Sequence, residues 1–392
     1  MMKTNRLFLV SSVVIFAAIA TLTSCASIAG SRIAPSPPIQ KVKDSNLKQT
    51  RPVNPKFVEA KTRFGFKLFS EILKEDSQKN VFVSPSSVAI ALSMTYNGAA
   101  GDTKQAMAKA LELQGMTLEE INQSNANLQQ VLQQADPKVQ LAIANSLWAS
   151  DKISFNPDFM SRNQKFYDAK VETVDFSNPS TPQQMNDWVK ESTRGKISQI
   201  VDKVSPDQAM FLLNAIYFKG NWTEKFNKAQ TQERPFYLAN GTQKKHPLMR
   251  QTGKYLYHET EQFQAVSLPY GNERLSFYVF LPKSKSNLSE FQKNLNAKNW
   301  QTWMNQFRKR QGSIQIPRFK MSYDVRLNDA LSALGMATAF DANKADFSGL
   351  SQTGTNIDEV KHKTFVEVNE EGTEAAAVTS VGIMPTSIQI EQ

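Results

Sequence analysis

The sequence is poor in the residues on which most metal and nucleophile chemistry depends. Its 392 residues include one cysteine, Cys25, and three histidines, His246, His258 and His362. A single thiol excludes an intrachain disulfide and a zinc site built from several cysteines. The sequence contains no G-x-S-x-G nucleophile elbow, no pair of histidines at helical spacing and no phosphate-binding glycine loop. We therefore expect a protein that is not an enzyme and that has no cofactor and no metal.

Glycine and proline are also scarce, and the positive charge is dispersed. The 16 glycines and 17 prolines exclude collagen-like and low-complexity classes, and the 40% hydrophobic and 21% charged residues are typical of a globular protein. The net charge is +10, yet the densest basic cluster, 308–310, is not interleaved with aromatic residues. We expect no nucleic-acid partner.

The N-terminal residues have the pattern of an export signal. Two basic residues precede an uncharged run at 7–22, which is shorter than the ~20 residues that a membrane span needs. The run ends in Leu-Thr-Ser-Cys, which resembles a bacterial lipobox with Cys25 as the acylated residue. We expect a signal peptide at 1–24, a flexible tether at 25–56, and an exported protein held at the cell envelope or outside the cell by a lipid on Cys25. The alternative is a cleavage site with an accidental cysteine.

Helical patterns prevail early in the remaining chain and strand patterns prevail late. Apolar residues at steps of three and four predict a helix over 57–72, and the nearly continuous apolar run 209–218 predicts a strand covered on both faces. Further helices are predicted at 86–96, 287–309 and 325–334, and further strands at 81–83, 139–143, 234–239, 244–249, 264–268, 275–281, 313–320 and 364–368. No proline-rich linker divides 57–392, so we expect an α+β fold in a single domain.

The segment 369–387 follows a good strand but is poor in large apolar residues. As a strand it would place only small residues on one face, namely Thr373, Ala375, Ala377 and Thr379. Gly372 supplies a flexible joint at its start. The composition suits a strand that enters a sheet, a mobile exposed loop, or an ordinary surface linker.

Several motifs resemble the serpin family of serine protease inhibitors, in the family's order. Residues 362–377, HKTFVEVNEEGTEAAA, are similar to the hinge of the serpin reactive loop. The other motifs are NVFVSPSSVAIALSMTYNGAAG at 80–101, NDWV at 186–189 with GKI at 195–197, NAIYFKGNW at 214–222, LPY at 268–270 and ADFSG at 345–349. The resemblance covers about 57–392.

This resemblance implies a monomeric inhibitor that acts as a suicide substrate on a serine protease, or on a cysteine protease as the other class. The implied fold packs helices on a large, mostly antiparallel sheet, with smaller sheets and an exposed reactive-centre loop at about 370–390. After the protease forms an acyl-enzyme, the loop enters the main sheet and deforms the protease. The implied loop hinge comprises Glu370, Glu371, Gly372, Thr373, Glu374, Ala375, Ala376 and Ala377.

The family spacing from Gly372 implies a reactive bond between Thr386 and Ser387. A small β-branched residue suits the small pocket of an elastase-like protease better than a trypsin-like pocket, which takes Lys or Arg. The resemblance also implies a polar cluster where the strands part, formed by Ser84, Ser87, Asn214 and His362. It further implies a point of first insertion formed by Trp222, Arg318 and Glu370.

The sequence departs from the family pattern at its end. Six residues follow Thr386, whereas serpins continue for several tens of residues that form three more strands. We therefore expect those strands to be missing from this chain. A serpin-like binding protein that does not inhibit, or an inactive truncated serpin, is the alternative function.

Overall fold

The computed structural model describes residues 53–77, 79–238, 241–283 and 287–386. The predicted signal peptide, Cys25 and Ser387 lie outside the described residues. None of the helices within them is long and apolar enough to cross a membrane.

Most of the longer helices begin at a capping residue or a proline that precedes an apolar period. In α1, the Asn54 side chain accepts from the amide of Lys56, Pro55 opens the helix, and five apolar residues at helical spacing are buried. The helices are α1 (Pro55–Glu75), α2 (Pro85–Tyr96), α3 (Gly101–Ala110), α4 (Leu118–Gln133), α5 (Pro157–Tyr167), α6 (Thr181–Ser192), α7 (Leu288–Asn294), α8 (Ala297–Met304), α9 (Asn328–Leu331) and α10 (Ala337–Phe340), with short turns η1 (Lys228–Gln230) and η2 (Ser332–Met336).

A six-stranded sheet forms the centre of the molecule, in the order β2-β1-β3-β11-β10-β9. Only the β1–β2 pair is parallel. Its strands are β1 (Val139–Ser150), β2 (Ala169–Val174), β3 (Met210–Asn221), β9 (Phe319–Arg326), β10 (Thr355–Val368) and β11 (Gly372–Pro385). The predicted α+β class and the large, mostly antiparallel sheet are confirmed.

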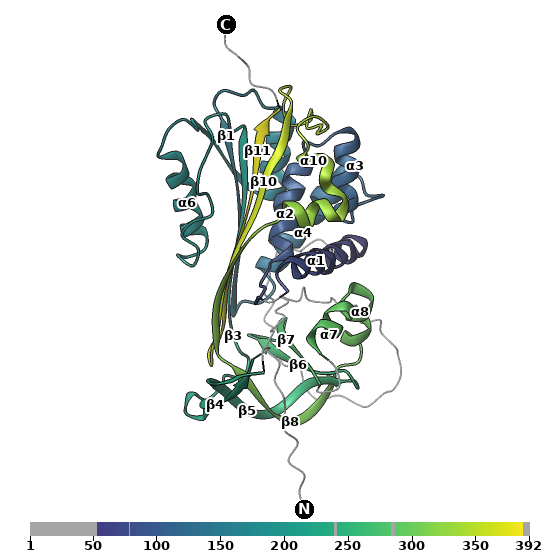
Figure 1. The fold of residues 1–392 in the computed structure, drawn as a ribbon, viewed down its shortest axis with the longest axis vertical. Coiled ribbons are helices and arrows are strands. Elements are labelled where there is room, and N and C mark those ends of the chain that lie inside the picture. Colours follow the sequence, from purple (N-terminus) through teal and green to yellow (C-terminus); the bar gives the residue numbers. More distant parts are fainter. Residues whose placement is uncertain (1–52, 78, 239–240, 284–286, 387–392) are drawn as a thin grey trace, which may run out of the picture.

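A second sheet has the order β4-β5-β6-β7, with β8 paired to β5. Its strands are β4 (Gln232–Tyr237), β5 (Gln243–Glu259), β6 (Phe263–Tyr270), β7 (Leu275–Pro282) and β8 (Arg308–Pro317). It lies at one end of the large sheet, close to α7 and α8, while α6 covers one face of the large sheet and α1 to α4 lie on the other (Figure 1).

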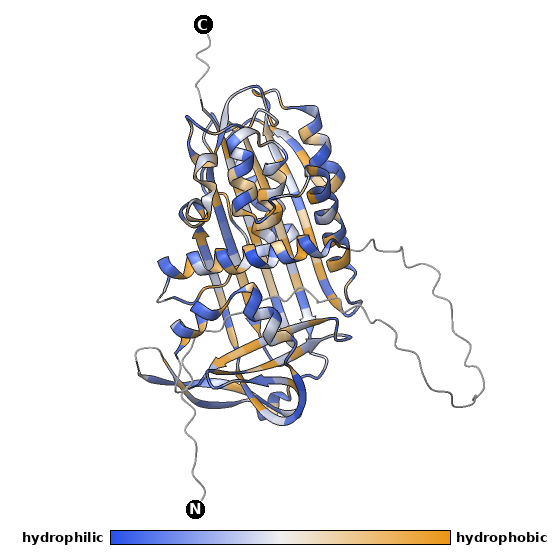
Figure 2. Ribbon diagram, turned by 90° about the vertical axis from the view of Figure 1, so that its right-hand side faces the viewer, coloured by the Kyte–Doolittle hydropathy of each residue, from blue (hydrophilic) through white to orange (hydrophobic). Residues whose placement is uncertain are grey.

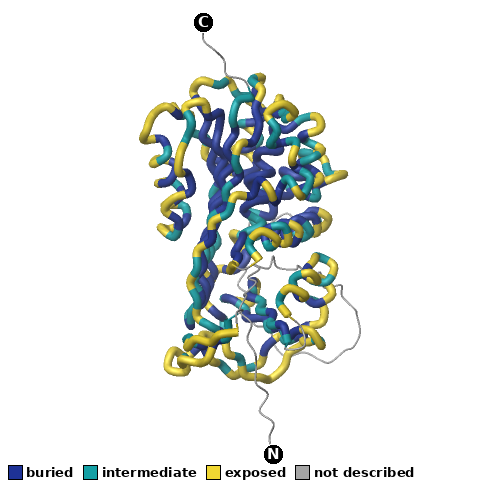
Figure 3. The backbone as a smooth tube through the Cα atoms, in the orientation of Figure 1, coloured by how far each residue is buried: buried dark blue, intermediate teal, exposed yellow. Residues whose placement is uncertain are grey.

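The core has two parts because the large sheet is covered on both faces. The larger cluster joins the sheet to α1, α2, α3 and the second sheet, and a smaller one fills the space under α6 with Trp148, Met185, Val189 and Tyr217. The central strands of the large sheet are therefore rich in apolar residues (Figure 2). The same strands are largely buried (Figure 3).

Three predicted elements differ from the structure. Residues 81–83 are buried but pair with no strand in the described chain, because the backbone carbonyl of Phe82 accepts from the Thr364 hydroxyl of β10 instead. The helix predicted over 287–309 is two helices, since Leu295 adopts an extended conformation and the Asn296 side chain caps α8. The strand predicted over 313–320 is likewise divided, between β8 and β9.

Candidate functional site

The segment predicted as an exposed reactive-centre loop is a central strand of the large sheet. β11 lies between β3 and β10 and is antiparallel to both, with Val378 opposite Ala215 on one side and Lys363 on the other. The exposed-loop prediction is therefore wrong for this conformation. The physical reason is that β3 and β10 together satisfy the backbone groups of β11, and small side chains allow it to enter between them.

The residues of β11 are buried on both faces of the sheet. Toward α2, Thr373, Ala377 and Thr379 are at most 5% exposed, and toward α6, Ala376 and Val378 are at most 2% exposed. A strand covered on both faces would normally be rich in large apolar residues. The sequence identified the small face toward α2 but not the burial of the opposite face.

Gly372 fits its place because no side chain could. A Cβ atom there would lie 2.0 Å from the carbonyl oxygen of Gly220 and 2.8 Å from the Cα of Asn221. The next residue, Thr373, accepts a hydrogen bond of 2.7 Å from the hydroxyl of Tyr270 on β6. The start of β11 is thus fixed against both sheets.

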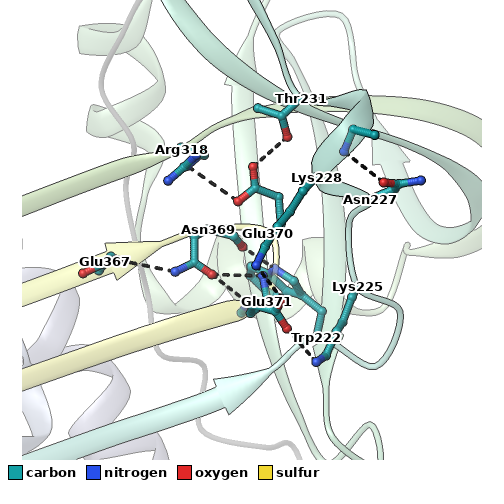
Figure 4. Close-up of polar contacts among 12 residues, drawn as sticks. Trp222, Lys225, Asn227, Lys228, Thr231, Arg318, Glu367, Asn369, Glu370 and Glu371 are labelled. Atoms are coloured by element: carbon teal, nitrogen blue, oxygen red, sulfur yellow. Dashed lines mark hydrogen bonds and ion pairs between the residues drawn. The ribbon is translucent and has the colours of Figure 1, made fainter.

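The structure brings Trp222, Arg318 and Glu370 together where β11 begins (Figure 4). The Trp222 indole stacks on Tyr270 at 4.7 Å between ring centroids and donates to the Asn369 carbonyl at 2.9 Å. Glu370 has a side chain only 4% exposed, and its Oε2 lies 3.6 Å from Arg318 Nε, which is half exposed. A carboxylate this buried is held by polar partners on more than one side.

Sequence reasoning missed the other partners at this point. The Thr231 hydroxyl donates to Glu370 Oε1 at 2.7 Å, and the exposed Glu371 pairs with Lys225 at 2.6 Å and Lys228 at 3.1 Å. These two lysines lower the pKa of Glu371. A cavity of about 520 Å³ opens among these side chains, lined by Lys228, Thr231, Gln232, Glu233, Pro247, Arg318, Asn369, Glu370 and Glu371.

The polar cluster under the sheet also assembles, and β11 contributes to it. The amide of Ser84 donates to His362 Nε2 at 2.9 Å, and Ser87 Oγ donates to the Asn214 side chain. Thr379 of β11 completes the cluster through His362 Nδ1 at 2.8 Å and Ser87 Oγ at 3.0 Å. The sequence analysis placed Thr379 on the correct face of the strand. A hydroxyl on that otherwise small face could have indicated a contact with the polar cluster.

His362 is a neutral residue in this arrangement. Its Nε2 accepts from Ser84, so the proton resides on Nδ1, which faces Thr379 and the Val378 carbonyl. Burial lowers the pKa of His362 to about 4, because an imidazolium would lose its hydration without gaining a carboxylate.

The predicted reactive residue lies at the far end of β11. The amide of Thr386 donates to the Gly354 carbonyl at 2.7 Å, and fourteen strand residues at ~3.3 Å each place it roughly 45 Å from Gly372. The Thr386 side chain packs against Gly354. In this conformation Thr386 is therefore part of the sheet end and does not project as a protease substrate would.

The sequence and the fold of this chain are similar to those of known proteins. The sequence matches the serpin (serine protease inhibitor) family over residues 59–392. It is 37% identical to human Serpin B8 over 332 residues, covering 82% of this chain and 88% of that protein. It is 34% identical to the leukocyte elastase inhibitor of Xenopus tropicalis over 348 residues, covering 84% and 90%. The fold matches the crystal structure of a thermophilic serpin, Tengpin, in the latent state, with a TM-score of 0.79, 32% identity and coverage of 84% and 90%.

Proposed function

Because the chain belongs to the serpin family, whose members are protease inhibitors rather than enzymes, we propose that it inhibits a serine protease as a suicide substrate. The single observation that carries the proposal is β11, a strand of small residues between β3 and β10 in the segment where a serpin carries its reactive loop. Inhibition requires that this segment also spends time outside the sheet, where a protease can reach Thr386.

The proposed chemistry is the acyl transfer of a serine protease, stopped at the acyl-enzyme. The protease serine attacks the Thr386 carbonyl, the bond to the Ser387 nitrogen breaks, and the protease histidine gives its proton to the leaving amine. Thr386 is then esterified to the protease. Strand formation by 372–385 carries that ester about 45 Å along the sheet and distorts the attached protease before water can hydrolyse the ester.

The proposed target is a protease with a small apolar specificity pocket. The small β-branched side chain of Thr386 would occupy that pocket. It carries no positive charge that the aspartate of a trypsin-like pocket could bind. The leukocyte elastase inhibitor among the relatives supports this class.

Incubation with a pancreatic elastase tests the proposal. We expect a complex that survives boiling in detergent, and a released fragment that begins with Ser387. Cleavage of the loop without a stable complex would support the alternative, a serpin-like protein that does not inhibit. Thr386→Lys is the matched variant, because it should transfer recognition from elastase to trypsin.

The membrane partner remains a proposal from the sequence. Cys25 would carry the lipid that keeps the exported inhibitor at the cell envelope. Detergent phase partitioning of the native protein tests this, with Cys25→Ser as the control. Recovery of the native protein in the aqueous phase would contradict the anchor.

A further inference from the structure

Glu374 is the only charged residue of β11, and the structure gives it two partners on the α6 face of the sheet. Its Oε2 lies 2.9 Å from Lys196 Nζ, and its Oε1 accepts from the Tyr217 hydroxyl at 2.6 Å. The side chains of Lys196 and Glu374 are only 27% and 22% exposed. Both carboxylate oxygens are therefore bonded in a partly dry site, where a charged hydrogen bond is stronger than at a free surface.

The turn that presents Lys196 is held by several hydrogen bonds. It follows α6, and the buried Thr193 hydroxyl bonds both the amide and the carbonyl of Ile197 at 3.1 Å. The backbone amide of Lys196 donates to the Thr193 carbonyl at 3.1 Å, and Arg194 bonds Gln140 on β1 at 2.9 Å. Lys196 is thus held over the sheet by contacts that do not involve β11.

The pair also offsets a repulsion that insertion creates. In the strand register Glu374 lies directly opposite Glu367 of β10 and Lys219 of β3. Like charges on facing strands are unfavourable. Glu367 has its own partner in Lys320 at 3.7 Å, which leaves Lys196 and Tyr217 as the groups bonded directly to Glu374. The hydrogen bonds from these two groups lower the pKa of Glu374 against the opposing effect of its burial.

We propose that Lys196 and Tyr217 form a clamp for the incoming loop, which captures Glu374 as the strand begins to insert and so favours inhibition over substrate turnover. The inference depends on the proposed inhibitory function. Glu374 is the third residue of β11, after Gly372 and Thr373, so the clamp closes while most of the strand is still outside. Lys196 and Tyr217 are positioning residues, because neither contacts the bond that is cleaved.

Titration of elastase with Lys196→Met tests the clamp. A partly buried, charge-assisted pair corresponds to a factor of about five in rate, so we expect the ratio of cleaved to complexed inhibitor to rise about fivefold. The rate of loop attack should stay unchanged, which a merely structural role would not predict. Lys190→Met, an exposed lysine on α6, is the matched control. Lys196→Glu should increase cleavage without complex formation more than Lys196→Met does. Combining Lys196→Glu with Glu374→Lys should restore inhibition.

The clamp is contradicted if Lys196→Met behaves like the wild-type protein, or if the charge exchange rescues nothing. A double-mutant cycle in urea separates this from failure of the proposed function. Lys196→Met and Glu374→Gln should be non-additive, with a coupling of about fivefold in the unfolding equilibrium of the inserted form. Wild-type protein that forms no elastase complex but shows this coupling would refute inhibition while retaining the Lys196–Glu374 contact of the inserted strand, and additivity would refute both that contact and the clamp.

Discussion

Placing a charge at the start of β11 should convert an inhibitor into a substrate. Thr373 is 5% exposed, lies opposite Gly220 in the register, and accepts the Tyr270 hydroxyl at 2.7 Å. In Thr373→Arg, the guanidinium must either be buried without an anion, at a cost of several kcal/mol, or keep the strand from entering. The lost hydrogen bond adds about 1 kcal/mol.

The magnitude follows from how much of this cost is present in the transition state for insertion. If the transition state carries about 2 kcal/mol of this cost, insertion slows about 30-fold. Hydrolysis of the acyl-enzyme is then faster than insertion. We expect elastase to cleave Thr373→Arg at the normal rate, with little or no complex stable in detergent.

One control makes the result specific. Thr373→Ser keeps the hydroxyl and should inhibit normally. Thr373→Arg protein that forms complex in the wild-type yield would refute the reasoning that β11 must enter the sheet during inhibition.

The other predictions concern stability. His362 has a pKa of about 4 in the fold against 6.5 ordinarily, so the unfolded chain binds the proton more tightly and the unfolding free energy should fall by about 3 kcal/mol as pH drops from 6.5 to 4. Urea unfolding at several pH values checks this, and His362→Gln should flatten the curve. Burial lowers the pKa of Lys61 to about 7, with the Ser93 hydroxyl at 3.2 Å as its hydrogen-bond partner. Lys61→Met should therefore raise the unfolding free energy at pH 7 by about 3 kcal/mol, whereas a melting temperature equal to wild type would contradict this. Glu370→Gln should lower the unfolding free energy by about 1 kcal/mol, since its partner Arg318 is half exposed. An unchanged urea midpoint would refute a stabilising role for that ion pair.

The parts of the fold predicted from sequence are those with a strong local signal. The run 209–218 is almost wholly apolar and forms the central strand β3, and the apolar period at 57–72 forms most of α1, which begins two residues earlier at Pro55. Such signals require only neighbours in the chain. The division between α7 and α8 was missed because Asn296 is an ordinary residue until its side chain caps the second helix.

The position of 372–385 could not be decided from sequence for a different reason. Small residues permit both an exposed loop and an inserted strand, and the choice depends on whether β3 and β10 separate. Lys196 and Tyr217 lie within two of the motifs that resemble the family, but nothing local shows that they contact Glu374. They are distant from Glu374 in the sequence, and only the register of β11 on β3 brings the three together.

The expectation that strands are missing after the loop concerns positions beyond the described residues. The two C-terminal strands that are described, β10 and β11, lie side by side within the large sheet. That expectation therefore stays a prediction from the sequence, and the intact mass of the native protein tests it.

Amide hydrogen exchange across 372–385, before and after reaction with elastase, tests the central claim most directly. The account predicts that a population of the free protein exchanges these amides rapidly, and that in the elastase complex they become as protected as those of β3. Equal protection in both samples, with no complex formed, would contradict it, because the segment would then be a fixed strand of the sheet.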